Sequence, residues 1–428
     1  MYGAQLIEAL RSRAAIPTPV GTGLGPVPAG QSPASTQALQ LDFFGAGGER
    51  MRAAGCDIVV DAKDLAVVGI TEIFSHLPKI LGLYKKLIRA ADERRPDLAV
   101  VIDSPAFNWR VARQMRKRGI PVVYYVCPQF WAWRQGRVRL LRKYVNKALV
   151  IFPFEEKFYR DRGVEATFVG HPLAEVPMPE ITRADYAAQH ALDAAKPWIT
   201  LMPGSRRKEV GMNLPAMLEA AARLGMGYEF LLPEARTLEP GFLQGLVQVS
   251  HQKSPPKRSL GEAPAARGGA DARSGAGTRL DPETGQAPSL RGAPSIHLVS
   301  EALPALRHSR AGIIASGTAT VEAALMETPF VMVYRVSPLT YALGKPRLKV
   351  AHYAMANLIA GEEVVPELVQ HRLTAGNILA EMNKIIPDGT AREKMIAGLK
   401  LVRERLKKTD GGGHPADRAA EVILEMLR

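Results

Sequence analysis

The stretch AGIIASGTATVEAALMETPFVMVYRV, residues 311–336, contains two short apolar runs with an amphipathic segment between them. The runs at 311–317 and 329–336 have the length and composition of buried strands, whereas 318–327 has helical spacing. A strand, a helix and a second strand in this order form the repeating unit of a parallel sheet that is covered by helices. We therefore expect a parallel α/β fold.

The same alternation continues along the chain and forms two series. In the first, strands are expected at 97–103, 121–126, 147–154 and 166–170, with helices at 109–119, 136–145 and 155–163. In the second, strands are expected at 198–205, 228–235, 295–300, 311–317 and 329–336, with helices near 212–224, 300–308 and 318–327. A Pro-containing stretch, 172–197, separates the two series, so the predicted fold is α/β with two doubly wound domains. Ligands of such folds bind at the carboxyl ends of the strands, and two facing domains create a cleft.

The predicted organisation is an N-terminal domain at 1–172, a second domain at 173–345 and a mainly helical segment at 346–428. Two stretches, 16–38 and 252–295, are rich in Pro, Gly, Ala and Ser and lack hydrophobic periodicity. Such segments bury too little apolar surface to offset the entropy of ordering. We interpret both as insertions and expect the second to be disordered.

Composition limits the class of protein. The 428 residues are 46% hydrophobic and 23% charged, which excludes a wholly disordered chain. The net charge of +14 predicts attraction to an anionic partner: nucleic acid, a phosphorylated substrate or an acidic lipid surface. Two cysteines are too few for a disulfide framework. We see no signal peptide and no apolar stretch long enough to cross a bilayer, so we expect a cytoplasmic protein.

Polar and glycine residues follow three of the predicted strands. Asp103 ends the first of these strands, the turn Pro203-Gly204-Ser205-Arg206 ends the second, and Ser316-Gly317-Thr318 ends the third, ahead of a helix that carries Glu322. Backbone N–H groups at the start of a helix can bind anionic oxygens, and an arginine adds a forked cation for phosphate. The alternative is that these residues are ordinary helix caps.

The sequence lacks the motifs that are typical of several kinds of enzyme chemistry. The sequence has no GxxxxGK[ST] loop, no GxGxxG turn between a strand and a helix, no HExxH and no Asp-x-Asp pair. We therefore expect no metal and no cofactor, with charge stabilisation from Arg206 and helix N-termini. His171 follows a predicted strand and is either a ligand contact or a turn histidine.

Residues 127–143, CPQFWAWRQGRVRLLRK, place Phe130, Trp131 and Trp133 beside five cations. Aromatic side chains beside cations suit a nucleic-acid surface or a membrane interface. A helix with a solvated basic face and internally packed aromatics explains the pattern equally well.

At these residues the chain resembles the lipid-A-disaccharide synthases, which are inverting glycosyltransferases. The matching segments are FFGAGGERMRAAGCD (43–57), VVGITEIFSHLPKI (67–80), VIDSPAFN (101–108), YYVCPQFWAWRQGRV (124–138), IFPFEEKFY (151–159), FVGHPL (168–173), PGSRRKEV (203–210), ASGTATVEAAL (315–325) and NLIAGEEVVPELVQ (357–370). The ordered set from YYVCPQFWAW to FVGHPL is highly specific, whereas ASGTAT occurs more widely in two-domain glycosyltransferases.

The resemblance implies two Rossmann-like domains of the GT-B type with an active cleft between them. It also implies a hexosyltransferase reaction that needs no metal. In this reaction, 2,3-diacylglucosamine passes from its UDP donor to 2,3-diacylglucosamine 1-phosphate, giving the β-1,6-linked disaccharide 1-phosphate and UDP. The domain at 1–172 would bind the acceptor and that at 173–345 the UDP-sugar. The family is peripheral at the inner face of the inner membrane, which suits the positive charge.

Site roles also follow from the resemblance. Asp103 is the leading candidate for the base, and a substrate-positioning role is its alternative. The diphosphate would meet Pro203, Gly204, Ser205 and Arg206, and the nucleotide would meet Ser316, Gly317, Thr318 and Glu322. The donor would also be reached by Asn357, Glu367 and Gln370 from the segment that returns towards the cleft.

One departure from the family pattern concerns the N-terminus. The family has an apolar strand and a Gly-Glu-x-Ser-Gly-Asp loop before the segment that matches Tyr2–Leu6, so we expect this strand and loop to be absent here. A truncated, inactive relative that binds membrane or nucleic acid is therefore one alternative. Another two-domain UDP-sugar enzyme, such as an epimerase, is a second. We expect no nucleic-acid partner under the main interpretation and keep a homodimer open.

Overall fold

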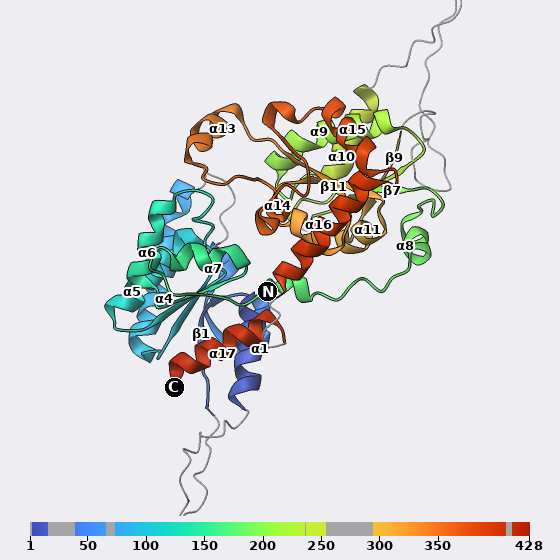
Figure 1. Cartoon of the computed structure of the whole chain (residues 1–428). Coiled ribbons are helices and arrows are strands. Elements are labelled where there is room, and N and C mark those ends of the chain that lie inside the picture. Colours follow the sequence, from blue (N-terminus) through green and yellow to red (C-terminus); the bar gives the residue numbers. More distant parts are fainter. Residues whose placement is uncertain (1, 16–38, 66–72, 236, 254–293, 408–412) are drawn as a thin grey trace, which may run out of the picture. The chain divides into compact units, whose positions relative to one another are not determined.

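The computed structural model describes residues 2–15, 39–65, 73–235, 237–253, 294–407 and 413–428 (Figure 1). The chain divides into two compact units. The N-terminal unit comprises residues up to 177 together with 342–351 and 402–428, and the C-terminal unit comprises 178–341 and 352–401. The predicted domain boundaries at 172 and 345 stay predictions. The insertion predicted at 16–38 lies outside the described residues, as does the one at 252–295 except for its ends.

A four-stranded parallel sheet in the order β3-β4-β5-β6 forms the centre of the N-terminal unit. Two further strands, β1 and β2, pair with each other in a separate parallel sheet. The strands are β1 (Phe43–Gly47), β2 (Cys56–Asp61), β3 (Ala99–Ile102), β4 (Val122–Tyr125), β5 (Lys147–Val150) and β6 (Ala166–Phe168). The helices are α1 (Tyr2–Ala14), α2 (Glu49–Ala53), α3 (Ala62–Leu65), α4 (Ile73–Arg94), α5 (Pro105–Lys117), α6 (Val138–Tyr144), α7 (Pro153–Arg160) and α17 (Pro415–Leu427).

The core of this unit lies between the four-stranded sheet and helices α4 to α7. All four residues of β4 are buried, as expected of a strand that is covered on both faces. Helices α1 and α17, from opposite ends of the chain, pack against each other (Figure 1).

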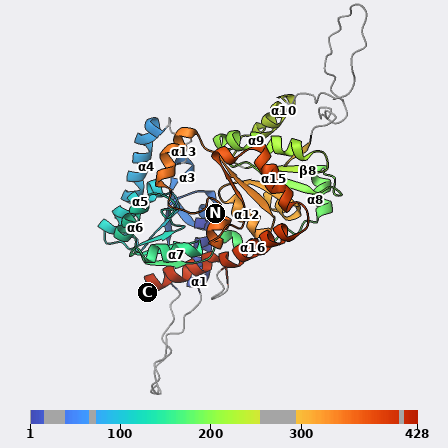
Figure 2. The same ribbon diagram turned by 45° about the horizontal axis from the view of Figure 1, so that its top comes forward.

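The C-terminal unit contains a six-stranded parallel sheet in the order β12-β11-β10-β7-β8-β9. Its strands are β7 (Trp198–Met202), β8 (Glu229–Pro233), β9 (Ser295–Val299), β10 (Ala311–Ala315), β11 (Phe330–Tyr334) and β12 (Glu367–Val369). Its helices are α8 (Arg183–His190), α9 (Arg207–Leu224), α10 (Phe242–Lys253), α11 (Ala302–His308), α12 (Ala319–Leu325), α14 (Met355–Ala360) and α15 (Ala375–Ile385). Helices α9 and α15 lie side by side (Figure 2). Helices α13 (Pro338–Gly344) and α16 (Thr390–Leu406) each contain residues of both units.

All nine strands predicted from the apolar runs are present, and the C-terminal segment is mainly helical as expected. The strand predicted at 147–154 is shorter than expected because α7 begins at Pro153. Proline suits the first turn of a helix, and the Glu155 carboxylate accepts hydrogen bonds from the N–H groups of Ile151 and Phe152. The helix predicted at 212–224 begins earlier, directly after Arg206.

None of the described helices is both long enough and apolar enough to cross a membrane.

Candidate active site

The loop after β3 holds Asp103 in an unusual backbone conformation. Asp103 and Ser104 have φ angles of 48° and 43°, in the left-handed region that residues other than glycine seldom adopt. Conformations of this kind cost free energy and cluster at functional sites. The turn at Asp103 and Ser104 changes the direction of the chain between the end of β3 and the start of α5.

Hydrogen bonds fix the main chain of Asp103, whereas no described residue binds its side chain. Its N–H donates to the Tyr125 carbonyl at 3.1 Å. Its carbonyl accepts from the Asn108 amide and from the Tyr124 hydroxyl, both at 2.7 Å. Within the described part of the chain, the exposed Asp103 carboxylate has no hydrogen bond or ion pair. The loop therefore presents a positioned carboxylate that is available to a ligand.

Tyr2 lies near this carboxylate, at the start of α1. Its ring contacts that of Tyr125 edge to face, with ring centroids 6.1 Å apart. Burial and the negative charge of Asp103 raise the pKa of the Tyr2 phenol above 10.0. The phenol thus keeps its proton at neutral pH and can donate a hydrogen bond beside Asp103.

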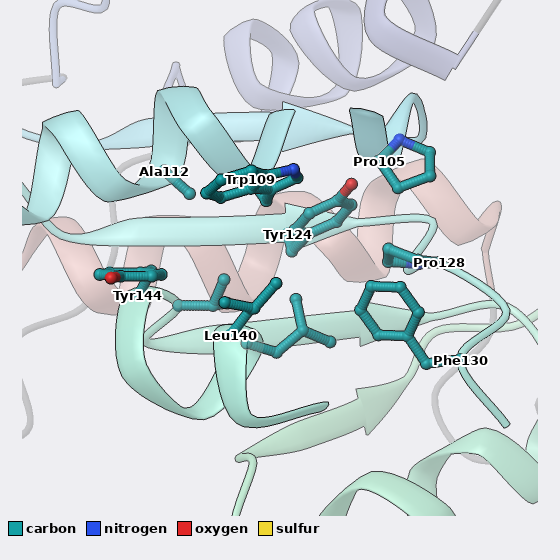
Figure 3. Close-up of a pocket in the computed structure, with 10 residues that line it drawn as sticks. Pro105, Trp109, Ala112, Tyr124, Pro128, Phe130, Leu140 and Tyr144 are labelled. Carbon is teal, nitrogen blue, oxygen red and sulfur yellow. The ribbon is translucent and has the colours of Figure 1, made fainter. Parts of the chain in front are cut away.

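A cavity of about 10 Å³ lies under the same loop (Figure 3). It is lined by Pro105, Trp109, Ala112, Tyr124, Pro128, Phe130, Leu140, Leu141, Tyr144 and Val145. A space of this size holds about one water molecule, and an apolar lining offers such a molecule no partners. The cavity is therefore a packing void in the core under the loop.

In the C-terminal unit, the loop after β7 contains the predicted diphosphate contacts. Gly204 has a φ of 124°, and a Cβ atom there would lie 2.9 Å from the Cβ of Glu209. The Glu209 carboxylate accepts from the Ser205 N–H at 3.4 Å and from the Arg206 guanidinium at 2.7 Å. Arg206 is 78% exposed at the start of α9, where N–H groups and a cation together favour anions.

The loop after β10 contains the predicted nucleotide contacts. The Ser316 hydroxyl donates to the Tyr353 carbonyl at 2.8 Å, and Gly317 has a φ of 132° with open space where a Cβ atom would lie. Thr318 precedes α12, in which Glu322 is half-buried. Burial raises the pKa of Glu322, and no described residue forms a hydrogen bond or ion pair with its carboxyl group. The Glu322 carboxyl group can therefore accept hydrogen bonds from hydroxyl groups of a ligand.

Glu367 and Asn357 have their polar atoms committed inside the protein. Glu367 accepts from the N–H groups of Tyr353 and Ala354 and from the Asn357 amide, all at 2.9 Å. Asn357 is fully buried, and its side-chain oxygen accepts from the N–H groups of residues 364 and 365. These hydrogen bonds fix the chain around α14. Both residues therefore stabilise the segment that connects α14 to β12.

Gln370 directly follows β12, and its side chain lies beside the residues that follow β11. Its side-chain oxygen accepts from the Val336 N–H at 3.3 Å, whereas its side-chain nitrogen is buried without a partner among the described residues. The Gln370 carbonyl accepts from the Arg335 guanidinium at 3.2 Å. Asn213 links this region to the β7 loop, since it accepts from the Arg335 N–H and donates to the Pro203 carbonyl, each at 3.0 Å.

Eight of the eleven predicted substrate-binding residues directly follow strands of one sheet: Pro203, Gly204, Ser205 and Arg206 follow β7, Ser316, Gly317 and Thr318 follow β10, and Gln370 follows β12. Glu322 lies within α12, Asn357 lies within α14, and Glu367 is the first residue of β12. Asp103 occupies the corresponding edge of the other unit's sheet. The roles assigned to these residues stay predictions.

Sequence reasoning missed the residues that hold the loops: Tyr2, Asn108, Tyr124, Glu209, Asn213 and Arg335. Asn108 offered a signal, because a polar residue one turn into a helix after a strand can bond back to that strand.

The structure describes two features for which the sequence left alternatives open: His171 and the aromatic-basic segment at 127–143. His171 is buried, its Nδ1 accepts from the Leu173 N–H at 3.2 Å, and burial lowers its pKa to about 4. It is thus a neutral turn histidine. In the aromatic-basic segment, Phe130 and Trp131 are buried, whereas Trp133 is 45% exposed.

An opening of about 460 Å³ follows β8 and β9 and is lined by Glu234, Ala235, Leu238, Glu239, Pro240, Leu243, Ser300 and Glu301. Three carboxylates line it, so this opening is unsuited to a diphosphate.

Comparison with known proteins decides the family. A family model described as lipid-A-disaccharide synthetase matches residues 31–256 and 289–412. The lipid-A-disaccharide synthase of Koribacter versatilis is 45% identical over 428 residues, covering 100% of this chain and 96% of that protein. The chain belongs to the lipid-A-disaccharide synthase family. The Acidobacterium capsulatum lipid-A-disaccharide synthase is 47% identical over 394 residues, covering 92% and 91% of the two chains.

Solved structures agree at the level of the fold. A glycotransferase of kitacinnamycin superposes with a TM-score of 0.54 at 15% identity, covering 100% of this chain and 97% of that one. The calicheamicin glycosyltransferase superposes with a TM-score of 0.51 at 16% identity, covering 99% and 94%. The predicted GT-B fold is thereby confirmed. As a lipid-A-disaccharide synthase family member, the chain is a hexosyltransferase of lipid A biosynthesis.

Proposed function

We propose that this lipid-A-disaccharide synthase family member transfers 2,3-diacylglucosamine from its UDP donor to 2,3-diacylglucosamine 1-phosphate. The acceptor 6-hydroxyl loses its proton to Asp103, and its oxygen attacks the anomeric carbon. The bond from that carbon to the diphosphate breaks with inversion, which gives the β-1,6-linked disaccharide 1-phosphate and UDP. A base at the acceptor and donors at the leaving group are what this displacement requires.

The Asp103 loop is the observation that supports the proposal most strongly. A base must accept a proton, so its carboxylate cannot be held in an internal ion pair. The Asp103 carboxylate meets this condition, and the hydrogen bonds from Asn108 and Tyr124 to its carbonyl keep it in position. Preorganisation of this kind lowers the cost of reaching the reactive geometry.

The C-terminal unit supplies the donor side of the proposal. Arg206 and the Pro203–Ser205 turn would hold the diphosphate, with Arg206 exchanging its bond to Glu209 for bonds to phosphate oxygens. Ser316, Gly317, Thr318 and Glu322 would line the nucleotide, and the free Glu322 carboxyl would accept from ribose hydroxyls. Gln370 would reach the donor, whereas Asn357 and Glu367 would act by positioning the loop beside it.

The same proposal covers the partners and the location. Both substrates are acylated and anionic, so the enzyme would work as a peripheral protein at the inner face of the inner membrane, to which the net charge of +14 attracts it. The proposal includes no cofactor, no metal and no nucleic acid. A homodimer stays a prediction.

The test is to incubate the purified protein with the two substrates in the presence of EDTA and to identify the products by mass spectrometry. We expect the disaccharide 1-phosphate and UDP in equal amounts. Formation of an epimerised UDP-sugar without disaccharide would contradict the proposal, as would the absence of product from protein whose folding has been shown by circular dichroism. Loss of product in EDTA, with recovery on adding Mg²⁺, would contradict the metal-independent mechanism alone.

A further inference from the structure

Helix α9 has a polar side chain on its buried, apolar face. Asn213 is 1% exposed, and Val210 and Met217, one helical turn to either side of it, are buried and apolar. Burying an amide costs free energy unless its hydrogen bonds are made, and asparagine is a poorer helix former than leucine or methionine. The amide of Asn213 must therefore gain from its hydrogen bonds what it loses through burial.

The two ends of this amide bind the backbone after two different strands. The Asn213 nitrogen donates to the carbonyl of Pro203, which directly follows β7, and the Asn213 oxygen accepts from the N–H of Arg335, which directly follows β11. Both distances are 3.0 Å. Because a carbonyl only accepts and an N–H only donates, these partners determine the orientation of the amide. Strand β10 lies between β7 and β11, so one side chain connects two loops that are not neighbours in the sheet.

On the β7 side, Asn213 holds the first residue of the turn that is proposed to meet the diphosphate. The Ser205 carbonyl of the same turn accepts from the Thr237 hydroxyl at 2.6 Å. Gly204, between the two held carbonyls, has a φ of 124°. The main chain of the turn is thus fixed on both sides of its glycine, directly before Arg206.

On the β11 side, the residues bound by Asn213 hold Gln370. The Arg335 guanidinium donates to the carbonyls of Gln370 and Leu373. The N–H of Val336 donates to the side-chain oxygen of Gln370 at 3.3 Å. Asn213 therefore connects the turn that carries Arg206 to the segment that carries Gln370.

We propose that Asn213 is a positioning residue for the diphosphate of the donor. Its amide fixes the turn at 203–206 relative to the end of β11, so that Arg206 is placed for the phosphates before the donor arrives. Groups that are already in place bind an anion without the cost of ordering them. The inference rests on the proposed function, because the turn at 203–206 has to bind the diphosphate.

The experiment is calorimetric titration of the full chain with UDP and with UMP. Asn213→Leu removes both hydrogen bonds at similar side-chain volume. Asn213→Asp keeps an acceptor for the Arg335 N–H, but an ionised carboxylate cannot donate to the Pro203 carbonyl. We expect both variants to raise the dissociation constant of UDP about tenfold, the size of effect of one well-placed hydrogen bond. The dissociation constant of UMP should rise less, because UMP lacks the terminal phosphate.

A double-mutant cycle with Arg206→Ala tests whether Asn213 acts through the turn. If Asn213 positions Arg206, then Asn213→Leu should weaken UDP binding by no more than about twofold once Arg206 is already alanine. Independent contributions would instead multiply, as they do for sites that are not coupled. A merely structural role for Asn213 predicts such independent effects.

Thr328→Val is the matched control for loss of a buried hydrogen bond. Thr328 is 3% exposed and precedes β11, at the end of this strand opposite to Arg335. Its hydroxyl donates to the Leu306 carbonyl at 2.7 Å. We expect the control, like Asn213→Leu, to unfold at a lower urea concentration than the wild type, but to bind UDP with the wild-type dissociation constant.

Three results would overturn the inference: wild-type affinity for UDP in both Asn213 variants, equal weakening of UDP and UMP, or independent effects in the cycle with Arg206→Ala. If Asn213→Leu does not fold, the ratio of the UDP and UMP dissociation constants of Asn213→Asp decides. A wild-type protein that is folded but does not bind UDP would contradict the proposed function itself. Binding of UDP by the wild type, with an unchanged ratio in the variants, would contradict the role of Asn213 alone.

Discussion

The loops around Asp103 and Asn357 both belong to segments that match the family, yet they use their polar atoms in opposite ways. Asp103 has a hydrogen-bonded backbone, and its carboxylate has no hydrogen bond or ion pair to any residue that the structure describes. Asn357 is fully buried and uses both ends of its amide in internal hydrogen bonds. A residue of the first kind can act on a substrate, whereas a residue of the second kind holds a structure together.

The largest effect should come from Asp103→Asn. Asparagine tolerates the left-handed backbone and keeps the shape of the side chain but cannot accept the proton. We expect kcat to fall about 10³-fold, within the range for a lost general base, with an unchanged unfolding midpoint. Asp97→Asn, two residues before β3 and also exposed, is the control and should retain the wild-type rate. A shared loss of rate in both variants would contradict the role of Asp103.

Asn357→Ala should show the opposite profile. It leaves buried N–H groups of residues 364 and 365 without their acceptor and should lower the free energy of unfolding by about 3 kcal/mol. Urea unfolding measures this difference. If the variant instead unfolds like the wild type but has a much lower transfer rate, Asn357 acts on the substrate and does not mainly hold the structure together.

The pH dependence of stability tests Glu155, a buried carboxyl whose pKa burial raises from 4.5 to about 7. Between these values the folded protein keeps a proton that the unfolded chain releases, so stability falls as the pH rises. Relative to Glu155→Gln, which does not titrate, the wild type should lose about 2.5 kcal/mol between pH 5 and pH 8. Parallel curves for the two proteins would contradict the raised pKa.

Arg206→Ala should weaken donor binding with little change in stability. Loss of a hydrogen-bonded charge at the diphosphate costs about 2 kcal/mol, or roughly 30-fold in the KM for the UDP-sugar. Arg207→Ala removes the neighbouring arginine, which is 60% exposed and pairs with Glu239, and should leave this KM unchanged. Equal effects from both variants would indicate a general charge effect.

The strands differ in how well the sequence predicts them, just as Asp103 and Asn357 do. Strands such as β4 and β10 are fully buried apolar runs, and their pattern alone predicts them. Strands β1, β2 and β12 were not predicted, and none of them is a fully buried apolar run: β1 and β12 each have one buried residue and β2 has two.

The position of Asp103 at a strand end was also visible in the sequence, whereas the internal use of Asn357 was not. Long-range contacts explain the rest. The hydrogen bond from the Arg335 N–H to Asn213 spans 122 residues, and no local sequence pattern predicts it.

The division of labour between the two units can be measured most directly by titrating Asp103→Asn with UDP in a calorimeter. The account predicts the wild-type dissociation constant, because the residues proposed to hold UDP all belong to the C-terminal unit, together with a transfer rate about 10³-fold lower in the same sample. A dissociation constant more than about tenfold weaker, corresponding to about 1.4 kcal/mol, would contradict it, since Asp103 would then contribute to nucleotide binding.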